Sequence, residues 1–316
     1  MNASTASVTI LGIFAADLSF RAARLPRIGE TLLGSDFAIG AGGKGSNQAV
    51  ACARSGGQAT LLTRIGRDVF GDLALKTWRQ AGIATDGVEI SDQDATGAAF
   101  IFIDEASGQN AIIVNPGAAR TLDRAFVERS RSRIAGSRVF ATQLEQPFEA
   151  ALHGLQIARE CRVTTVLNPA PAPTSELPGT VWSLCDVVVP NEVEASMLTG
   201  IGVDSPQRAI EAADVLMAKG AANVIVTLGA QGVLLRTPTL CRHLPPVVAG
   251  TVRDTAGAGD AFMGGLCTAL AAGRTLADSA YFANAVAGLS VTRSGTAASM
   301  PDRDEIDSLL ERLATA

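Results

Sequence analysis

Short apolar runs alternate with amphipathic segments of helical length from about residue 123 to residue 232. The strand-like runs lie in RVFATQLE (138–145), VTTVLNPAP (163–171), CDVVVPN (185–191) and NVIVTLGAQG (223–232). The helical patterns lie at 123–134, at 147–161, from about Glu192, and at 206–219. This alternation predicts repeated strand–helix–strand units, and hence a three-layer α/β/α fold with a mostly parallel central sheet.

The first 120 residues add to this sheet and also predict a second one. Residues 7–11 and 59–66 are typical of strands, and helices are expected from about Ser46 and up to Gly82. Two apolar runs flank a turn-forming segment at 104–110, which predicts a hairpin over about 97–114. With the segment near 17–40, this hairpin is expected to form a small antiparallel sheet, a lid, outside the main layer. No repeat or linker divides the chain, so we expect one domain over 1–316.

Composition excludes several classes of protein. The net charge of −5 argues against nucleic acid as the main partner, because binding the phosphate backbone favours a basic face. The five cysteines are odd in number and contain no CxxC pair, and only two histidines are present, so a disulfide framework or a zinc site is not expected. No signal peptide is recognisable, and the apolar stretch 261–272 is too short to span a membrane. A cytoplasmic enzyme with no membrane partner is the default expectation.

Polar residues and glycines follow the predicted strands. In parallel α/β sheets, ligands bind outside the carboxyl ends of the strands. The residues at these positions are Asp17, Glu145, Asn168, Asn191, Gly229 and the turn at 254–260.

The stretch DTAGAGDAF (254–262) carries the sharpest chemical signal. Gly257, Ala258 and Gly259 allow a ligand to approach the backbone closely, and a following helix would aim its free N–H groups at the same point, which predicts an anion site. Asp260 would repel an anion, but a carboxylate here makes sense if the anion is a transferring phosphoryl group and Asp260 orients the hydroxyl that attacks it. The alternative is that Asp260 only caps the helix and Asp254 is a turn residue.

The stretch GGKGSNQ (42–48) is a second candidate. It is not a Walker A loop, because Lys44 is followed by Gly45 rather than by Ser or Thr. Gly43 permits close backbone approach, and the side chains of Lys44 and Asn47 suit the hydroxyls of a polyol. The alternative is a helix N-terminus with a solvated lysine.

Three further motifs are weaker. Asn191 and Glu194 in PNEVEA lie three residues apart at a helix start. Their oxygens suit Mg²⁺, directly or through water. The alternative is that the two residues form a capping box. Glu145 in QLEQP is either a ligand at a strand end or a surface acid. The glycine turn in VTLGAQG (226–232) suits phosphates or a ribose.

Taken together, these stretches resemble the ribokinase-like carbohydrate kinases, the PfkB family, nearly from end to end. The combination of GGKGSNQAV with DTAGAGD is highly specific for that family. The matching stretches are PRIGET (26–31), GGKGSNQAV (42–50), IGRDVFGD (65–72), LNPAPA (167–172), PNEVEA (190–195), VTLGAQG (226–232), DTAGAGDAF (254–262) and VTRSGTAASMP (291–301).

The resemblance implies a role for each motif in ATP-dependent phosphorylation of a sugar. Asp260 would be the catalytic base, and the turn at Gly257 would present the amides of Ala258, Gly259 and Asp260 to the phosphoryl group. The sugar would be held by Asp17, Gly43, Lys44, Asn47 and Glu145. Mg²⁺ and the phosphates would be organised by Asn191 and Glu194, with Glu194 acting through water. The nucleotide would be lined by Thr227, Gly229, Gly232 and Asn284.

The resemblance also implies activation by a monovalent cation, usually K⁺, and a homodimer formed through the lid. The positions that match the cation site, some through backbone carbonyls, are Asp254, Ala256, Ser290, Arg293, Gly295 and Ser299.

One residue departs from the family pattern and bears on the substrate. The expected reaction is transfer to the primary 5-hydroxyl of a pentose, D-ribose first. Ala15 stands where an asparagine is common two residues before Asp17, and a site without that amide discriminates less between sugars. 2-Deoxyribose, another pentose or a nucleoside is the alternative substrate. A non-catalytic sugar sensor is the alternative class, and it would be expected to have lost Asp260 or the glycines.

Overall fold

The structure is a computed structural model that describes residues 6–315. Within that range the main sheet has nine strands in the order β13-β12-β11-β10-β9-β8-β1-β4-β5. The β11–β12 and β12–β13 pairs are antiparallel and the other pairs are parallel. The strands are β1 (Ser7–Leu11), β4 (Gln58–Gly66), β5 (Val88–Ser91), β8 (Val139–Thr142), β9 (Thr164–Leu167), β10 (Val187–Val188), β11 (Val224–Thr227), β12 (Val233–Arg236) and β13 (Cys241–Leu244).

Helices cover both faces of this sheet, which confirms the three-layer architecture. Successive strand residues point to opposite faces, so Ile10 packs in one core and Leu11 in the other. The first core is completed by α1 (Lys44–Arg54), α2 (Val69–Ala81), α9 (Ala258–Ala271), α10 (Leu276–Ser290) and α11 (Arg303–Thr315). The second is completed by α3 (Arg124–Arg129), α4 (Arg131–Ala135), α5 (Phe148–Glu160), α6 (Thr180–Ser183), α7 (Glu192–Thr199) and α8 (Pro206–Ala218).

Helices α1 and α9 lie unusually close together. At Gly264 of α9, an added Cβ would lie 2.4 Å from the Cβ of Ala51 and 2.6 Å from the backbone nitrogen of Cys52 in α1. Only glycine at this position lets the two backbones approach so closely. The contact brings the N-terminal halves of both helices to the same region of the molecule.

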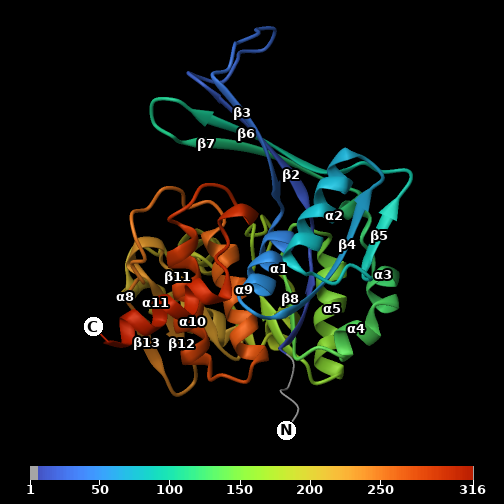
Figure 1. The fold of residues 1–316 in the computed structure, drawn as a ribbon. Coiled ribbons are helices and arrows are strands. Elements are labelled where there is room, and N and C mark those ends of the chain that lie inside the picture. The colour runs from blue at the N-terminus through green and yellow to red at the C-terminus, as the bar shows by residue number, and fades with distance from the viewer. Residues whose placement is uncertain (1–5, 316) are drawn as a thin grey trace.

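A second sheet projects from the body of the molecule (Figure 1). Its order is β3-β2-β6-β7, from β2 (Ala15–Ala22), β3 (Asp36–Gly42), β6 (Thr96–Asp104) and β7 (Asn110–Gly117). The expected 97–114 hairpin forms as β6 and β7, but the expectation of an entirely antiparallel sheet is wrong, because β2 pairs with β6 in parallel. The physical reason is that β2 follows β1 and β6 follows β5, so both strands leave the parallel main sheet in the same direction.

Other boundaries also differ from the expected ones. The helix expected over 123–134 breaks at Ser130 into α3 and α4, and strands β5, β12 and β13 were not predicted. Strands β5 and β13 are mostly half-buried or exposed, so no buried apolar run marks them in the sequence. In the part of the chain that the structure describes, no helix has the length and apolar character needed to cross a bilayer.

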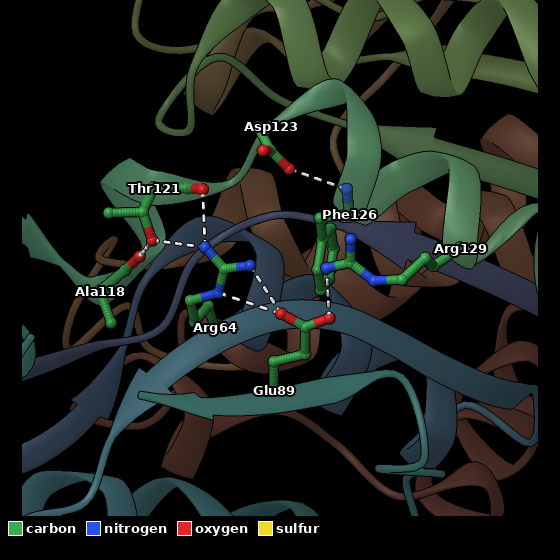
Figure 2. Close-up of polar contacts among 7 residues, drawn as sticks. All are labelled: Arg64, Glu89, Ala118, Thr121, Asp123, Phe126 and Arg129. Carbon is green, nitrogen blue, oxygen red and sulfur yellow. Dashed lines mark hydrogen bonds and ion pairs between the residues drawn. The ribbon is translucent and has the colours of Figure 1, made fainter. Parts of the chain in front are cut away.

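Arg64 joins the end of the lid to the main sheet (Figure 2). From β4 it donates through Nη2 to Oε2 of Glu89 in β5, at 2.6 Å, and through Nη1 to the carbonyl and hydroxyl oxygens of Thr121, at 2.7 and 2.6 Å. Thr121 ends the short 3₁₀ turn Ala118–Thr121 that follows β7. The guanidinium also lies 5.5 Å from the ring centre of Phe126 in α3. One cation therefore links two strands, the base of the lid and a helix.

We expect Arg64→Met to lower the free energy of unfolding by about 2–3 kcal/mol, because Glu89 and the Thr121 carbonyl lose charge-assisted partners. Arg129→Met is the matched control, since Arg129 also pairs with Glu89 but its side chain is 57% exposed against 18% for Arg64. The control should lose less than about 1 kcal/mol. Urea unfolding measures both, and equal losses would contradict this account.

Candidate functional site

A recess of about 150 Å³ lies at the carboxyl ends of β9, β10 and β11. Of the residues expected at one rim, Asn168, Asn191 and the 257–260 turn line this recess, whereas Asp17, Glu145 and Gly229 do not. The recess is lined by Lys44, Asn168, Ala170, Val189, Asn191, Glu194, Thr227, Thr255, Gly257, Ala258, Gly259, Asp260 and Met263.

The turn before α9 forms one wall of the recess. Gly257 is the N-cap residue with φ of 76°, in the left-handed region, and a Cβ there would lie 3.2 Å from Cα of Thr296. A Cβ on Gly259 would meet no atom within 4 Å, so the space in front of this residue is open. The amide of Ala258 donates to the Thr255 carbonyl at 3.2 Å, whereas the first-turn amides of Gly259 and Asp260 have no partner within the helix. The helix start can therefore receive an anion.

Asp260 is buried, with 6% of its surface exposed, and both of its carboxylate oxygens accept from α1. Asn47 Nδ2 donates to Oδ2 at 3.0 Å, and Gln48 Nε2 donates to Oδ1 at 3.0 Å. The side chain makes no capping bond to its own helix. The alternative in which Asp260 serves only as a helix cap is therefore wrong.

The N-terminus of α1 forms the opposite wall. Gly43 has φ of 84°, and a Cβ there would lie 2.7 Å from the Ile13 carbonyl oxygen and from the Ala15 nitrogen. The backbone N–H of Lys44 donates to Oε2 of Glu145 at 2.8 Å. Glu145 is thus turned inward and is not the surface acid of the alternative interpretation.

Three carboxylates act on the ammonium group of Lys44. Asp260 raises the pKa of Lys44 most, burial opposes this, and Glu145 and Glu194 add to the increase. Burial raises the pKa of Glu145 to about 7, against the opposing effect of Lys44. Burial also raises the pKa of Glu194. A further carboxylate, Asp17, adds to the increase in the pKa of Glu145.

Asp17 lies on β2 at the base of the small sheet. Thr296 Oγ1 lies 3.1 Å from Asp17 Oδ2 and 2.8 Å from the carbonyl oxygen of Ala41 in β3. Burial raises the pKa of Asp17 to about 6, the Thr296 hydrogen bond lowers it, and Asp260 raises it. Thr296 was not among the predicted site residues, although it lies in the matching stretch VTRSGTAASMP, because the sequence does not show that this stretch reaches β2.

Asn191 and Glu194 form the capping box that was one of the two alternatives for them. Asn191 Oδ1 accepts from the Glu194 nitrogen at 2.8 Å, and Glu194 Oε2 accepts from the Asn191 nitrogen at 2.9 Å. Both residues also line the recess. The capping role therefore coexists with access to a ligand, which Glu194 can meet through its second oxygen.

The residues predicted for the nucleotide lie in two places. Thr227 lines the recess at the end of β11. Gly229 and Gly232 bound the turn between β11 and β12, with φ of 49° and 86°. Asn284 of α10 lies near this turn, because its Nδ2 donates to the Pro245 carbonyl at 2.7 Å and a Cβ on Gly232 would lie 2.7 Å from the carbonyl carbon of Pro245.

The residues predicted for a monovalent cation come from two loops that Asp254 joins. Its Oδ1 accepts from the Ala256 nitrogen and its Oδ2 from the Gly295 nitrogen, both at 2.9 Å. The Arg293 side chain is paired with Glu305, so only its carbonyl is left for a cation. The remaining predicted positions have hydroxyls bonded to nearby carbonyls, Ser290 to Ala287 and Ser299 to Thr296. Among residues 6–315 there is no group of three or more His, Cys, Asp or Glu side chains suited to a metal ion.

Known proteins resemble this chain along nearly its whole length. The model of the pfkB family carbohydrate kinases matches residues 5–303. A curated protein named ribokinase from Haemophilus influenzae is 38% identical over 305 residues, covering 96% of this chain and 98% of the relative. A deoxyribokinase from Salmonella typhi is 34% identical over 303 residues, covering 96% and 98%. The solved structure of Arabidopsis thaliana ribokinase complexed with ribose and ATP has a TM-score of 0.92 and 27% identity, covering 97% of this chain and 99% of that one.

The raised carboxyl pKa values predict how stability depends on pH. With pKa values of about 6 for Asp17 and about 7 for Glu145, the folded protein binds more protons than the unfolded chain between roughly pH 4 and pH 7. These two groups therefore make the protein without ligands less stable as pH rises through that window.

We expect the free energy of unfolding of Glu145→Gln, relative to that of the parent, to be higher at pH 8 than at pH 5. The reason is that the variant lacks one buried acid, which is charged in the parent at pH 8. Urea midpoints at the two pH values measure this. Glu149→Gln is the control, since Glu149 is exposed on the first turn of α5. If the difference in urea midpoint between parent and Glu145→Gln is the same at both pH values, the explanation is wrong.

Proposed function

This chain belongs to the pfkB family of carbohydrate kinases, and from that premise we propose that it transfers the terminal phosphoryl group of ATP to the 5-hydroxyl of a pentose, D-ribose first. One observation carries the proposal. A buried carboxylate, Asp260, stands on the first turn of a helix whose unpartnered N–H groups open into a recess beside Lys44. A base and an anion site in one place are what phosphoryl transfer to a hydroxyl requires.

In this mechanism, Asp260 accepts the proton of the sugar hydroxyl as the oxygen attacks the terminal phosphorus. The bond from phosphorus to the bridging oxygen breaks, and ADP leaves with the electron pair. The amides at Gly259 and Asp260 donate to the phosphoryl oxygens, and the amide of Ala258 joins them if it leaves the Thr255 carbonyl. Since the transition state is loose, positioning and charge stabilisation supply most of the rate.

The sugar side of the site is supplied by α1 and its neighbours. Gly43 offers its backbone, Lys44 and Asn47 donate, and the carboxylates of Asp17 and Glu145 accept from hydroxyls. The small sheet acts as a lid over the sugar, because Asp17 lies on its strand β2. Closing that lid excludes water, which would otherwise accept the phosphoryl group.

Thr227, Gly229, Gly232 and Asn284 would line the nucleotide. Asn191 and Glu194 would hold Mg²⁺, Glu194 through water. The free oxygen of Glu194 and its position in the recess support this, as do the oxygen ligands that Mg²⁺ prefers. Mg²⁺ supplies positive charge that neutralises the phosphates.

A monovalent cation, K⁺, binds between the loops that Asp254 joins. The donor set there contains only oxygens, from one carboxylate, two hydroxyls and backbone carbonyls, which suits a hard cation. We expect turnover to be higher in K⁺ than in tetramethylammonium at equal ionic strength. Equal rates would contradict the proposed cation site.

The protein is a homodimer through the lid. On the face of the small sheet opposite Asp17, Phe20 packs on Phe37 and Phe100 with ring centres 4.7 and 5.7 Å apart, and all three are exposed. Ile39 and Ile113 extend this apolar face. A second copy would cover it. The mass from light scattering, with Ile113→Lys as the disrupting variant, tests the dimer.

We also propose a cytoplasmic location. All five cysteines are free, and three of them are buried, as expected in a reducing compartment.

The second candidate substrate is 2-deoxyribose, and Ala15 favours it. Residues two apart on a strand share a face, so Ala15 lies on the same face of β2 as Asp17. Its methyl group has no hydrogen-bonding capacity for a sugar hydroxyl. The relatives include proteins named for each of the two sugars.

We expect Asp260→Asn to lower kcat by about 10²–10⁴-fold, since the base is lost while the shape of the side chain is kept. Sugar binding by calorimetry should remain within a few-fold of the parent. Coupled ADP detection measures turnover, and the exposed Asp304→Asn is the control. Turnover of Asp260→Asn near that of the parent would contradict the proposed role of Asp260 as the base.

A pentose panel with the parent and Ala15→Asn tests the substrate. The new amide can bond a hydroxyl, so the ratio of kcat/KM for ribose over 2-deoxyribose should rise by about 10-fold or more. Ala98→Asn is the control, because Ala98 pairs with Ala16 and lies on the other face of the sheet from Asp17. An unchanged ratio would show that Ala15 does not set the preference.

A further inference from the structure

The two amides that hold Asp260 are not equivalent. Resting on the proposed function, we propose that Gln48 is a positioning residue, which fixes Asp260 through Oδ1 and leaves Oδ2 as the oxygen that takes the sugar's proton. Gln48 is not expected to touch either substrate. Its contribution is to hold the carboxylate in one orientation while Asn47 exchanges partners.

The hydrogen bonds of Gln48 fix the orientation of its amide. Nε2 donates to Asp260 Oδ1 at 3.0 Å and to Asn168 Oδ1 at 3.2 Å, which uses both of its hydrogens. Asn168 cannot turn over, because its Nδ2 donates to the Val189 carbonyl at 2.8 Å. On the other side, Oε1 of Gln48 accepts from Nε2 of Gln143. Reversing the Gln48 amide would break bonds on both sides.

The surroundings of Gln48 are rigid. The side chain is 1% exposed and that of Gln143 is fully buried, so water does not compete for these bonds. The α1 backbone is held next to it, since the Ser46 nitrogen donates to the Ile13 carbonyl at 3.0 Å and Ser46 Oγ accepts from Trp78 Nε1 at 2.9 Å. A group so held transmits its own position to Asp260.

Asn47, unlike Gln48, has an amide oxygen without a hydrogen-bond partner in residues 6–315, as expected of a residue that binds a ligand. Its Nδ2 donates to Asp260 Oδ2, but its Oδ1 is buried and has no hydrogen-bond partner among the residues that the structure describes. An unpaired buried amide oxygen is costly unless a ligand supplies a donor. A sugar hydroxyl at this point would satisfy Asn47 and meet Asp260 Oδ2, while Gln48 keeps its hold on Oδ1.

Gln48→Leu tests the positioning role, with Gln146→Leu as the matched control. Gln146 is another buried glutamine, and its Nε2 donates to Thr142 Oγ1 and the Gln143 carbonyl rather than to Asp260. We expect Gln48→Leu to lower kcat by about 10²-fold with the sugar dissociation constant, measured by calorimetry without nucleotide, within about threefold of the parent. The control should keep kcat within a few-fold. Equal kcat losses in both variants would overturn the proposal.

Gln48→Glu supplies a second readout that does not depend on the fold tolerating leucine. It keeps the acceptor for Gln143 but places a second carboxylate against Asp260, so the two share a proton. The acid limb of the kcat–pH profile should move to higher pH by about one unit or more. The other charged groups that act on Asp260 are the same in parent and variant: Lys44, Asp17, Glu145 and Glu194. An unmoved profile would overturn the proposal.

Asp260→Asn, assayed alongside, separates this inference from the proposed function. If Asp260→Asn keeps its turnover, the proposed function fails. If Asp260→Asn is inactive while Gln48→Leu matches Gln146→Leu, only the role of Gln48 fails.

Discussion

The close contact between α1 and α9 is the constraint on which the site depends. Gly264 lets the two helices approach until Asn47 and Gln48 reach the carboxylate of Asp260. Any side chain at that glycine would separate the helices and lengthen both hydrogen bonds. Packing in the core therefore sets the geometry of the polar recess, although Gly264 itself touches no ligand.

The recess concentrates charge at a cost in stability. The carboxylates of Glu145, Glu194 and Asp260 act on a single ammonium group, that of Lys44, and Asp17 acts on Glu145. Burial opposes ionisation of Asp17, Glu145 and Glu194, so keeping these groups charged costs stability when no ligand is bound. In the proposed function, sugar hydroxyls would donate to Asp17 and Glu145 and would offset part of that cost.

Local pattern was enough to predict six of the nine strands of the main sheet, most of its helices and the rim where Asn168, Asn191 and the 257–260 turn meet. It was not enough wherever a contact joins distant segments. The bond from Gln48 to Asp260 spans 212 residues, and the one from Thr296 to Asp17 spans 279. Both Gln48 and Thr296 lie in stretches that match the family, GGKGSNQAV and VTRSGTAASMP, but a local pattern does not say which distant side chain each of them meets. The parallel pairing of β2 with β6 was missed for the same reason, because it follows from how the main sheet orders its strands.

The Thr296 hydroxyl carries one hydrogen and faces two acceptors, Asp17 Oδ2 and the Ala41 carbonyl in β3. It can satisfy only one of them at a time. In the proposed function a sugar hydroxyl would also donate to Asp17, which would make that carboxylate a weaker acceptor for the Thr296 hydrogen without removing its lone pairs. The hydrogen would then shift toward the Ala41 carbonyl, so that the bond from Thr296 to the outer strand of the small sheet would tighten when the sugar binds.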